Sequence, residues 1–387
     1  MDAVVYSGNN RIRLLHCGAE FFPELEAACD AARFEILLET YIFAADDTGA
    51  RVKAALIRAA QRGVRVHVTT DWLGSGRKRC AELDEKFVAA GVQHRTFNPW
   101  FMNGVARMHR KICVVDGELA FLGGLNLNDD MLADDDSGTP LPYPRWDFAI
   151  AIRGPLVRAI HREALHQWMT LTGLNILARW ENFRQTRDFK PEWSSEPAIA
   201  ALIVRDNLRN RRAIQRDIMR ALGHARSSAW IANPYFAPGR RMRNALSSAA
   251  RRGVDVTLLL GVGQFMMQDA VTRSYYPKLL RSGVKIFEYR KTQLHGKVAV
   301  VDEHWSTVGS SNYDGFSLFI NHEANVVVKD REFTLDLKEH IANGIADGEE
   351  VRLEEFINMP WHTRAWHGIA FLIYRGIMRV ITLGRFS

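Results

Sequence analysis

One eighteen-residue pattern occurs twice in the chain, and this repeat constrains the fold more than any other feature. The first copy, HRKICVVDGELAFLGGLN, covers residues 109–126, and the second, HGKVAVVDEHWSTVGSSN, covers residues 295–312. In both copies Lys stands two residues after His, Asp seven, Gly fourteen and Asn seventeen. Equal intervals in both copies indicate a duplicated unit, so we expect two units built alike.

Each copy contains a β-strand pattern that begins beside two basic side chains. Four apolar residues follow each Lys, and a turn-prone pair that starts with Asp ends the run. Side chains two apart on a strand share a face, so His109 and Lys111 point into one space, as do His295 and Lys297. An ammonium attracts an anion such as phosphate, and neutral imidazole can act as nucleophile or base. The pattern therefore predicts chemistry on an anionic group.

The remaining motif positions supply small residues, amides and carboxylates. The G-[GS]-x-N segments would bring backbone close to a phosphate and offer amide donors to its oxygens. The residues concerned are Gly124, Asn126, Ser310 and Asn312. Asp116 and Asp302 stand an odd number of residues after the His, so we expect them to point away from the His/Lys face and to brace the strand ends.

The signature H-x-K-x4-D with a trailing G-[GS]-x-N resembles that of the phospholipase D superfamily, and the resemblance extends over most of the chain. Within it, the strings RMHRKI, FLGGLN, LHGKVAV, HWSTVGSSN and FEYR occur in the order of the bacterial cardiolipin synthase B type. The resemblance implies one active site formed by two pseudo-twofold related lobes, with no metal or other cofactor. It carries the catalytic motif onto His109, Lys111, Asp116, His295, Lys297 and Asp302.

An acidic residue opens an apolar strand after each copy, Asp147 in the first half and Glu323 in the second. In phospholipase D relatives an acidic residue in this place hydrogen-bonds an active-site imidazole and stabilises its charged form. Either residue could instead be an ordinary buried carboxylate paired with a nearby Arg. The sequence leaves open which acid would support which histidine.

The order of strands and helices also recurs, which predicts an α/β fold. A strand, a helix and a strand over 34–68 return over 230–258, and AAQRGVRVHV and AARRGVDVTL are offset by 190 residues, close to the 186 between the two motif histidines. We expect each lobe to be a mixed sheet flanked by helices. The predicted limits are 1–180 for the first lobe, 181–197 for a linker, 198–350 for the second lobe and 351–387 for a membrane-associated amphipathic tail.

The first half carries an insertion, NDDMLADDDSGTPLPYPR, that has no counterpart of that length in the second. Its aspartates lack the alternation and terminal Glu of a calcium-binding EF-hand loop. We therefore expect a solvated loop over the entrance of the site.

Two apolar stretches suggest contact with a membrane. The segment 97–102 gathers aromatic residues ahead of Arg107 and Arg110, as an interfacial anchor would, although burial against the second lobe fits equally well. The tail from 361 to 386 has helical apolar spacing and several arginines, while its longest uncharged run, Ala365 to Tyr374, has only ten residues. This run is too short to span a bilayer, so an in-plane amphipathic helix fits better than a spanning one. A helix docked on the second lobe is the alternative.

Composition limits the partners and the compartment. A net charge of +7 and a pI near 9.3 favour an anionic partner, either nucleic acid or an acidic membrane surface. The four cysteines stand singly, which indicates neither zinc nor disulfides and suits a reducing cytoplasm. Neither a signal-peptide pattern nor a membrane-spanning run is present in the sequence. An enzyme of lipids would then be peripheral, on the cytoplasmic face of the bacterial inner membrane.

The resemblance implies a phosphatidyl transfer in which His109 attacks phosphorus and His295 acts as acid and then as base. In a cardiolipin synthase the acceptor is a glycerol hydroxyl of phosphatidylglycerol, and phosphatidylethanolamine or a free polyol could also enter. The alternatives are a phospholipase or nuclease that uses water, for which the basic cluster 209–212 leaves room, and a non-catalytic binder of anionic membranes. The apolar tail argues against nucleic acid. The oligomeric state stays open, because the duplication lets one chain build a complete site.

Overall fold

A computed structural model describes residues 4–102, 104–134, 137–172, 197–206, 210 and 212–381. Apart from Pro197, the predicted linker lies outside the described residues, as do Arg209, Arg211 and the last six residues of the tail. Contacts divide the chain into two compact units. The first comprises Met1–Asp130 and Phe148–Leu202, and the second comprises Met131–Asp147 and Ile203–Ser387.

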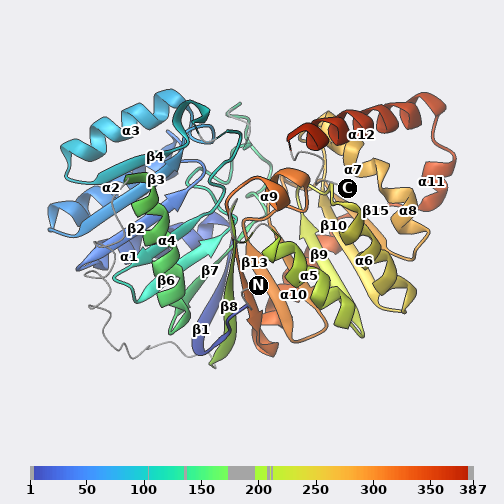
Figure 1. The fold of residues 1–387 in the computed structure, drawn as a ribbon, viewed down its shortest axis with the longest axis horizontal. Helices are drawn as coiled ribbons and strands as arrows, with labels where there is room; N and C mark the ends of the chain where they lie inside the picture. Colours follow the sequence, from blue (N-terminus) through green and yellow to red (C-terminus); the bar gives the residue numbers. More distant parts are fainter. Residues whose placement is uncertain are drawn as a thin grey trace. The chain divides into compact units, whose positions relative to one another are not determined.

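The first unit is a mixed sheet with helices on both faces (Figure 1). Its elements are β1 (Ser7–His16), α1 (Cys17–Ala31), β2 (Glu35–Thr40), α2 (Asp47–Gln61), β3 (Arg65–Asp71), α3 (Arg77–Ala89), β4 (Gln93–Phe97), the 3₁₀ turn η1 (Pro99–Phe101), β5 (Ile112–Val115), β6 (Leu119–Gly123), β7 (Phe148–Arg153) and α4 (Leu156–Thr172). A further strand, β8 (Ala198–Arg205), crosses the division between the units and pairs with β1 through Ala198 and Ala200.

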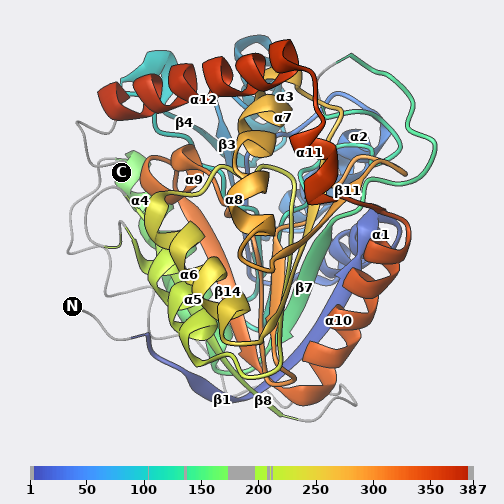
Figure 2. The ribbon, with the colours of Figure 1, turned by 90° about the vertical axis from the view of Figure 1, so that its right-hand side faces the viewer.

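The second unit repeats this plan, with α10 on one side of its sheet and α5 and α6 on the other (Figure 2). Its elements are α5 (Ala213–His224), β9 (Ser228–Asn233), α6 (Arg240–Arg251), β10 (Asp255–Gly261), α7 (Met266–Ser274), α8 (Tyr276–Leu280), β11 (Lys285–Tyr289), β12 (Val298–Val301), β13 (Trp305–Gly309), α9 (Gly315–Phe319), β14 (Glu323–Lys329), α10 (Arg331–Ala346), β15 (Glu349–Glu350), α11 (Leu353–Ile357) and α12 (Trp361–Ile381).

Strand order confirms the predicted duplication. The first unit has the order β7-β6-β5-β2-β3-β4, and the second has β14-β13-β12-β9-β10-β11. In each, three strands run parallel and the motif strand pairs antiparallel with the first of them. Even the register repeats, because Ile112 lies opposite Glu39 and Val298 opposite Ala232.

Local chemistry explains why the repeated elements end alike. Helices α2 and α6 both stop just before a glycine, Gly63 and Gly253, with φ of 89° and 90°. Only glycine takes this left-handed conformation without steric cost, so the chain turns there into the next parallel strand. On one face of the first sheet, apolar residues of α1, α2 and α3 form a continuous core with the strands, while α4 covers the other face.

The division of the chain follows contacts rather than the repeat. Residues 131–147, which the sequence analysis placed in the first lobe, belong to the second compact unit. Backbone hydrogen bonds explain the difference, since Trp146 N donates to Gln293 O and His295 N donates to Trp146 O, each at 2.9–3.0 Å. The limits of the repeated lobes in sequence stay a prediction.

The tail forms the expected helix, α12, and it has two different apolar faces. The inner face packs on the second unit, where Ala370 and Met378 are fully buried and the Tyr374 hydroxyl accepts a hydrogen bond from Gly315 N at 2.7 Å. The outer stripe, consisting of Trp366, Ile369, Ile373, Ile377 and Val380, is exposed. Among the described helices, none combines the length and apolarity needed to cross a bilayer.

Candidate active site

The first motif strand, β5, begins beside a buried histidine and lysine. His109 and Lys111 are both less than 9% exposed, and Lys111 Nζ donates to the His109 carbonyl at 2.8 Å. Tyr41, which directly follows β2, flanks both: its ring centroid lies 5.0 Å from that of His109 and 5.2 Å from Lys111 Nζ. Tyr41 was not predicted from the sequence, although its place at the end of the strand paired with β5 was the available signal.

The second motif strand, β12, places His295 and Lys297 in the same way. Both are 2% exposed, and Lys297 Nζ donates to the His295 carbonyl. Burial lowers the pKa of Lys297 to about 8, although the Asp147 carboxylate opposes this shift. An incoming phosphate anion would favour the charged ammonium again, because opposite charges stabilise each other most strongly where water is excluded.

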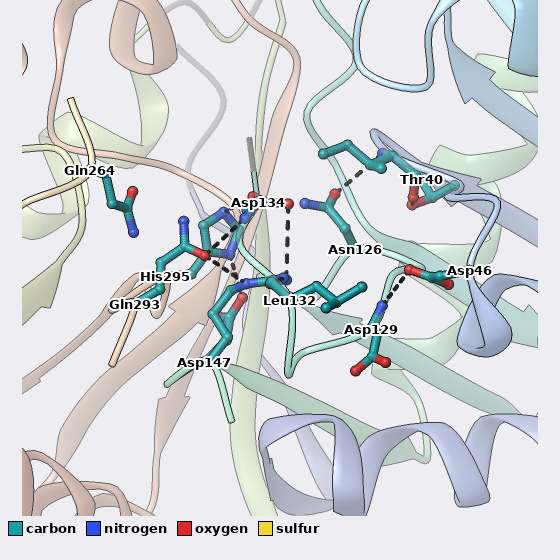
Figure 3. Close-up of polar contacts among 12 residues, drawn as sticks. Thr40, Asp46, Asn126, Asp129, Leu132, Asp134, Asp147, Gln264, Gln293 and His295 are labelled. Atoms are coloured by element: carbon teal, nitrogen blue, oxygen red, sulfur yellow. Dashed lines mark hydrogen bonds and ion pairs between the residues drawn. The ribbon is translucent and has the colours of Figure 1, made fainter. Parts of the chain in front are cut away.

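His295 carries a carboxylate at each ring nitrogen (Figure 3). Asp147 Oδ2 lies 2.5 Å from Nδ1 and Asp134 Oδ2 lies 3.5 Å from Nε2. Burial and the neighbouring Lys297 lower the pKa of His295, whereas both carboxylates raise it. The Asp147 contact fixes the ring orientation and stabilises the imidazolium, as an acid/base histidine requires.

The segment that was expected to be a solvated loop takes part in this network. Residues 137–140 are exposed, but Arg145 is buried and donates to Gln293 Oε1 at 3.2 Å and to Leu132 O at 2.6 Å. Asp134 N also donates to Gln293 Oε1, at 3.0 Å (Figure 3). None of Asp134, Arg145 and Gln293 was predicted from the sequence as part of the site. The Arg-Trp pair just before Asp147 was the only feature of the sequence that indicated burial at the end of this segment.

The two acids behave differently. Asp147 stands after the first motif yet contacts the histidine of the second, which answers for His295 the question that the sequence left open. Glu323 is fully buried at the start of β14, and the Ser310 hydroxyl donates to its Oε2 at 2.5 Å. The hydroxyl of Ser310 is therefore directed at Glu323.

Each motif asparagine has one buried side-chain atom that forms no hydrogen bond within the described residues. Asn126 Oδ1 accepts from Ile42 N at 3.3 Å, while its buried Nδ2 has no hydrogen-bond partner among the described residues. Asn312 is buried, and its Oδ1 likewise has no hydrogen-bond partner among the described residues. Because turning an amide by 180° exchanges its donor and acceptor, this position can also present an N–H group. Buried polar atoms without partners are rare and suit a ligand, here an oxygen of phosphate. The N–H of Gly124, in contrast, already donates to Phe148 O at 2.8 Å.

The motif aspartates accept hydrogen bonds from the backbone at the start of the neighbouring strands, β2 and β9. Asp116 accepts from the backbone N–H groups of Arg33, Phe34 and Glu35 at 2.7–3.0 Å. Asp302 does the same with Arg226, Ser227 and Ser228 at 2.8–3.2 Å. Both residues have φ of 53°. These contacts brace the ends of β2 and β9, and they lie on a different side of the strand from His and Lys.

One buried ionic cluster occurs in the first unit at a position where the second has glycine. Arg110, between His109 and Lys111, lies 2.8 Å from Glu39 and 2.7 Å from Glu163 on α4. Burial raises the pKa of Glu39 to about 7, although the Arg110 guanidinium opposes the shift. Gly296 takes the place of Arg110 in the second motif, and Ala232 lies at the register position of Glu39.

Comparison with known proteins places this geometry in a family. A family model described as "Cardiolipin synthase, PLD-like domain" matches residues 25–136 and 218–344, so it covers both motifs and more than half of the chain. Cardiolipin synthase B of Escherichia coli strain K12 is 39% identical over 381 residues, which cover 95% of this chain and 88% of that protein. Cardiolipin synthase 1 of Bacillus anthracis is 30% identical and matches 89% of this chain and 68% of its own length.

A solved structure has the same fold at low sequence identity. Phosphatidylserine synthase of Haemophilus influenzae Rd KW20 superposes with a TM-score of 0.70, and the match covers 98% of this chain and 97% of that one. Its sequence is only 14% identical, so this similarity concerns the fold alone.

Proposed function

Because the chain belongs to the family of phospholipase D-like cardiolipin synthases, we propose that it is a phosphatidyltransferase that makes cardiolipin. The substrates would be phospholipids: one phosphatidylglycerol donates its phosphatidyl group, and a glycerol hydroxyl of a second accepts it. Free glycerol leaves in the first step. Phosphatidylethanolamine as donor, or a free polyol as acceptor, would use the same chemistry.

The transfer would take two steps at a site shared by both motifs. In the first, a nitrogen of His109 attacks phosphorus, the bond from phosphorus to the head-group oxygen breaks, and protonated His295 gives its proton to that oxygen. In the second, His295 takes a proton from the incoming hydroxyl, whose oxygen attacks phosphorus and displaces His109. The phosphatidyl group thus passes through a phosphatidyl-histidine, and both histidines return to their starting state.

Lysines and amides would stabilise the charge that develops on the phosphate oxygens. Lys111, Lys297, Asn126 and Asn312 are assigned this role on the motif positions that they hold. A unit charge about 4 Å away contributes on the order of 4 kcal/mol at an effective dielectric near 20. Ser310 and Gly124 would support the site through the backbone and Glu323 rather than through direct donation.

The observation that carries the proposal is the contact of 2.5 Å between His295 Nδ1 and Asp147 in a buried setting. A histidine that must both release and accept a proton needs a pKa near neutrality, and burial alone would keep it deprotonated. Asp147 counteracts burial. By the repeat, we assign Glu323 the same supporting role toward His109.

We also propose that the enzyme is peripheral on the cytoplasmic face of the inner membrane and that α12 contributes to its attachment. The outer stripe of α12 and the three arginines Arg364, Arg375 and Arg379 support this, because apolar area and positive charge together bind anionic bilayers. Trp100, Phe101 and Met102 add a second exposed apolar surface in the first unit.

Incubation with phosphatidylglycerol labelled in its acyl chains and, separately, in its head group tests the proposal. We expect cardiolipin and free glycerol in equal amounts. Phosphatidic acid in place of cardiolipin would show that water is the acceptor and that the chain is a phospholipase. Cleavage of single-stranded DNA without lipid turnover would assign it to the nucleases.

A further inference from the structure

The second unit contains a pocket that the transfer reaction does not use. It encloses about 430 Å³ and is lined by residues of α6, α7, α8, α11 and α12. Figures 1 and 2 both show α12 lying across α7, with α8 and α11 nearby. Of the described residues that line it, none is a candidate catalytic residue. A volume of this size suits a small ligand or a lipid head group.

The pocket is strongly cationic. Its lining includes Arg243, Arg273, Lys278 and Arg364. Arg273 is neutralised by Glu288, with two contacts of 2.8 Å. Among the described residues, the other three form no ion pair with a carboxylate. Three basic side chains that line one pocket without a carboxylate partner would attract an anion into it, because opposite charges stabilise each other.

Arg243 is held in place by its surroundings. Its guanidinium lies 4.6 Å from the ring centroid of Tyr275, and Nη1 donates to the Pro238 carbonyl at 2.5 Å. Burial lowers the pKa of Arg243. A guanidinium whose orientation is already fixed loses little freedom when it binds, and its fork of N–H groups matches the oxygens of a phosphate.

The walls of the pocket favour a lipid over a soluble phosphate. Tyr275 and Phe371 meet edge to face with ring centroids 5.6 Å apart. Phe371 belongs to α12, whose outer stripe is exposed and apolar. A phosphate ester that carries acyl chains would therefore place its charge among the cations and its chains along apolar surface.

We propose that this pocket is an accessory site for the phosphate head group of an anionic phospholipid, separate from the transfer site. A bound lipid would tie α12 to α6 and α8 and hold the outer stripe of α12 at the bilayer. The site goes beyond the proposed transfer, because it would bind lipid without reacting with it.

Photolabelling tests this site directly. Phosphatidylglycerol with two short acyl chains, one ending in a photoreactive group, is irradiated with the full-length His109→Ala chain, so that the lipid is not consumed. We expect labelled peptides from α8, α11 or α12. The variant Lys278→Gln/Arg364→Gln, in the same background, should reduce this labelling about tenfold or more, because it removes two charged hydrogen-bond donors from the pocket.

The control variant Arg281→Gln/Arg379→Gln removes the same charge from exposed positions, one directly after α8 and one in α12, that do not line the pocket. It should keep labelling within about twofold. Equal loss in both variants would overturn the proposal in favour of unspecific attraction. Absence of labelling from α8, α11 and α12 would also overturn it.

Competition experiments show whether the pocket binds a lipid or a soluble phosphate ester. Activity measurements show whether the pocket is separate from the transfer site. An excess of unlabelled dihexanoyl phosphatidylglycerol should suppress labelling, whereas equal concentrations of sn-glycerol 3-phosphate or dihexanoyl phosphatidylcholine should not. Equal suppression by sn-glycerol 3-phosphate would assign the pocket to soluble phosphate esters and overturn the lipid assignment.

In a chain that keeps His109, the variant Lys278→Gln/Arg364→Gln should turn over dispersed short-chain substrate at the unaltered rate. An unaltered rate also shows that the variant is correctly folded. A lost rate in a folded variant would make the pocket part of the transfer site.

Discussion

The two motif strands share one backbone plan but differ in the side chains around them. β5 and β12 pair with equivalent strands, β2 and β9, in the same register. The aspartates that follow them have the same φ, and each accepts hydrogen bonds from the backbone at the start of that neighbouring strand. Around β5, however, lie the Tyr41 ring and the ionic cluster of Arg110. Around β12 lie Gly296 and the carboxylates of Asp147 and Asp134. The comparison teaches that a repeated backbone fixes where a histidine stands, while its neighbours decide what it does.

The largest expected effect tests whether both histidines are needed. His109→Ala should lower kcat by about 10⁴-fold or more, because the nucleophile is lost, and His295→Ala by about 10²–10⁴-fold, because general acid and base catalysis is lost. Cardiolipin formation measures both, with circular dichroism as the check on folding. Substantial activity in either variant would sink the idea that the two motifs form one site.

Their separate roles can be resolved with a donor whose leaving group needs little protonation. His295→Asn should then form the phosphatidyl adduct and fail to discharge it, since the second step still needs a base. Intact-mass measurement and peptide mapping should place the adduct on His109. An adduct on His295 in a His109→Asn chain would reverse the roles and keep the mechanism, whereas none in either would remove the covalent step.

The next effect concerns the two acids. Asp147→Asn should lower kcat by about 10²–10³-fold, because it removes the contact that orients the imidazole and stabilises its charged form. Asp147 raises the pKa of His295 against burial, so the pKa should fall further in the variant. The protonated acid is then lost at a lower pH, and the alkaline limb of the kcat/KM profile should move to lower pH.

Glu323→Gln is the matched control, since it changes the equivalent residue, which accepts a hydrogen bond from the Ser310 hydroxyl. Its profile should not show this shift of the alkaline limb. Identical shifts in both variants would break the comparison and make the two histidines interchangeable.

Stability gives the fourth test, because only the first unit has the Arg110 cluster. Arg110→Met should lower the free energy of unfolding by about 3–5 kcal/mol, since it leaves two carboxylates without their guanidinium. Without Arg110 the pKa of Glu39 should rise further above its value of about 7. The folded state then resists ionisation of Glu39 more strongly, so the loss should be larger at pH 8 than at pH 5. Urea unfolding measures it, and Arg110→Met/Glu39→Gln should recover part of the stability. A loss below about 1 kcal/mol at both pH values would contradict this account.

The smallest effect should be the same in both units. Asp116→Asn and Asp302→Asn should each cost about 1–2 kcal/mol, because an amide accepts backbone N–H groups less strongly than a carboxylate does. Burial would raise the pKa of Asp302, but the N–H groups of Ser227 and Ser228 hold it below its ordinary value of 3.8. Stability from this group is thus present above about pH 4 and is lost as pH falls through the folded-state pKa. Unfolding at pH 7 and at pH 3 should show Asp302→Asn closer to the parent at pH 3, and an equal gap at both would refute the bracing role.

Much of the fold could be predicted because its signals are local. Alternating apolar residues, glycines such as Gly63 and Gly253, and equal intervals set the strands and their duplication. The side of the strand on which His109 and Lys111 stand follows from a period of two. Helical spacing likewise predicted α12, but it could not separate the face that packs on the second unit from the exposed one, because both are apolar.

The neighbours of His295 could not be predicted, since they depend on the path of the chain. Asp134 and Arg145 stand in a polar insertion that reads as a solvated loop, and nothing local indicates that Trp146 pairs with the residue before His295. Long-range pairing of this kind joins residues about 150 positions apart, beyond the reach of any pattern in a short window.

The folding of residues 131–147 with the second unit limits how the protein can be dissected. A cut between the repeats, anywhere in 181–197, would put His295 on one fragment and Asp147 on the other. Two such fragments, produced separately, would each contain a full motif and still lack a working acid/base pair. Activity regained on mixing the two fragments would therefore show that they have reassembled. If each fragment is fused to a different protein, this activity would report that the two fused proteins are close together.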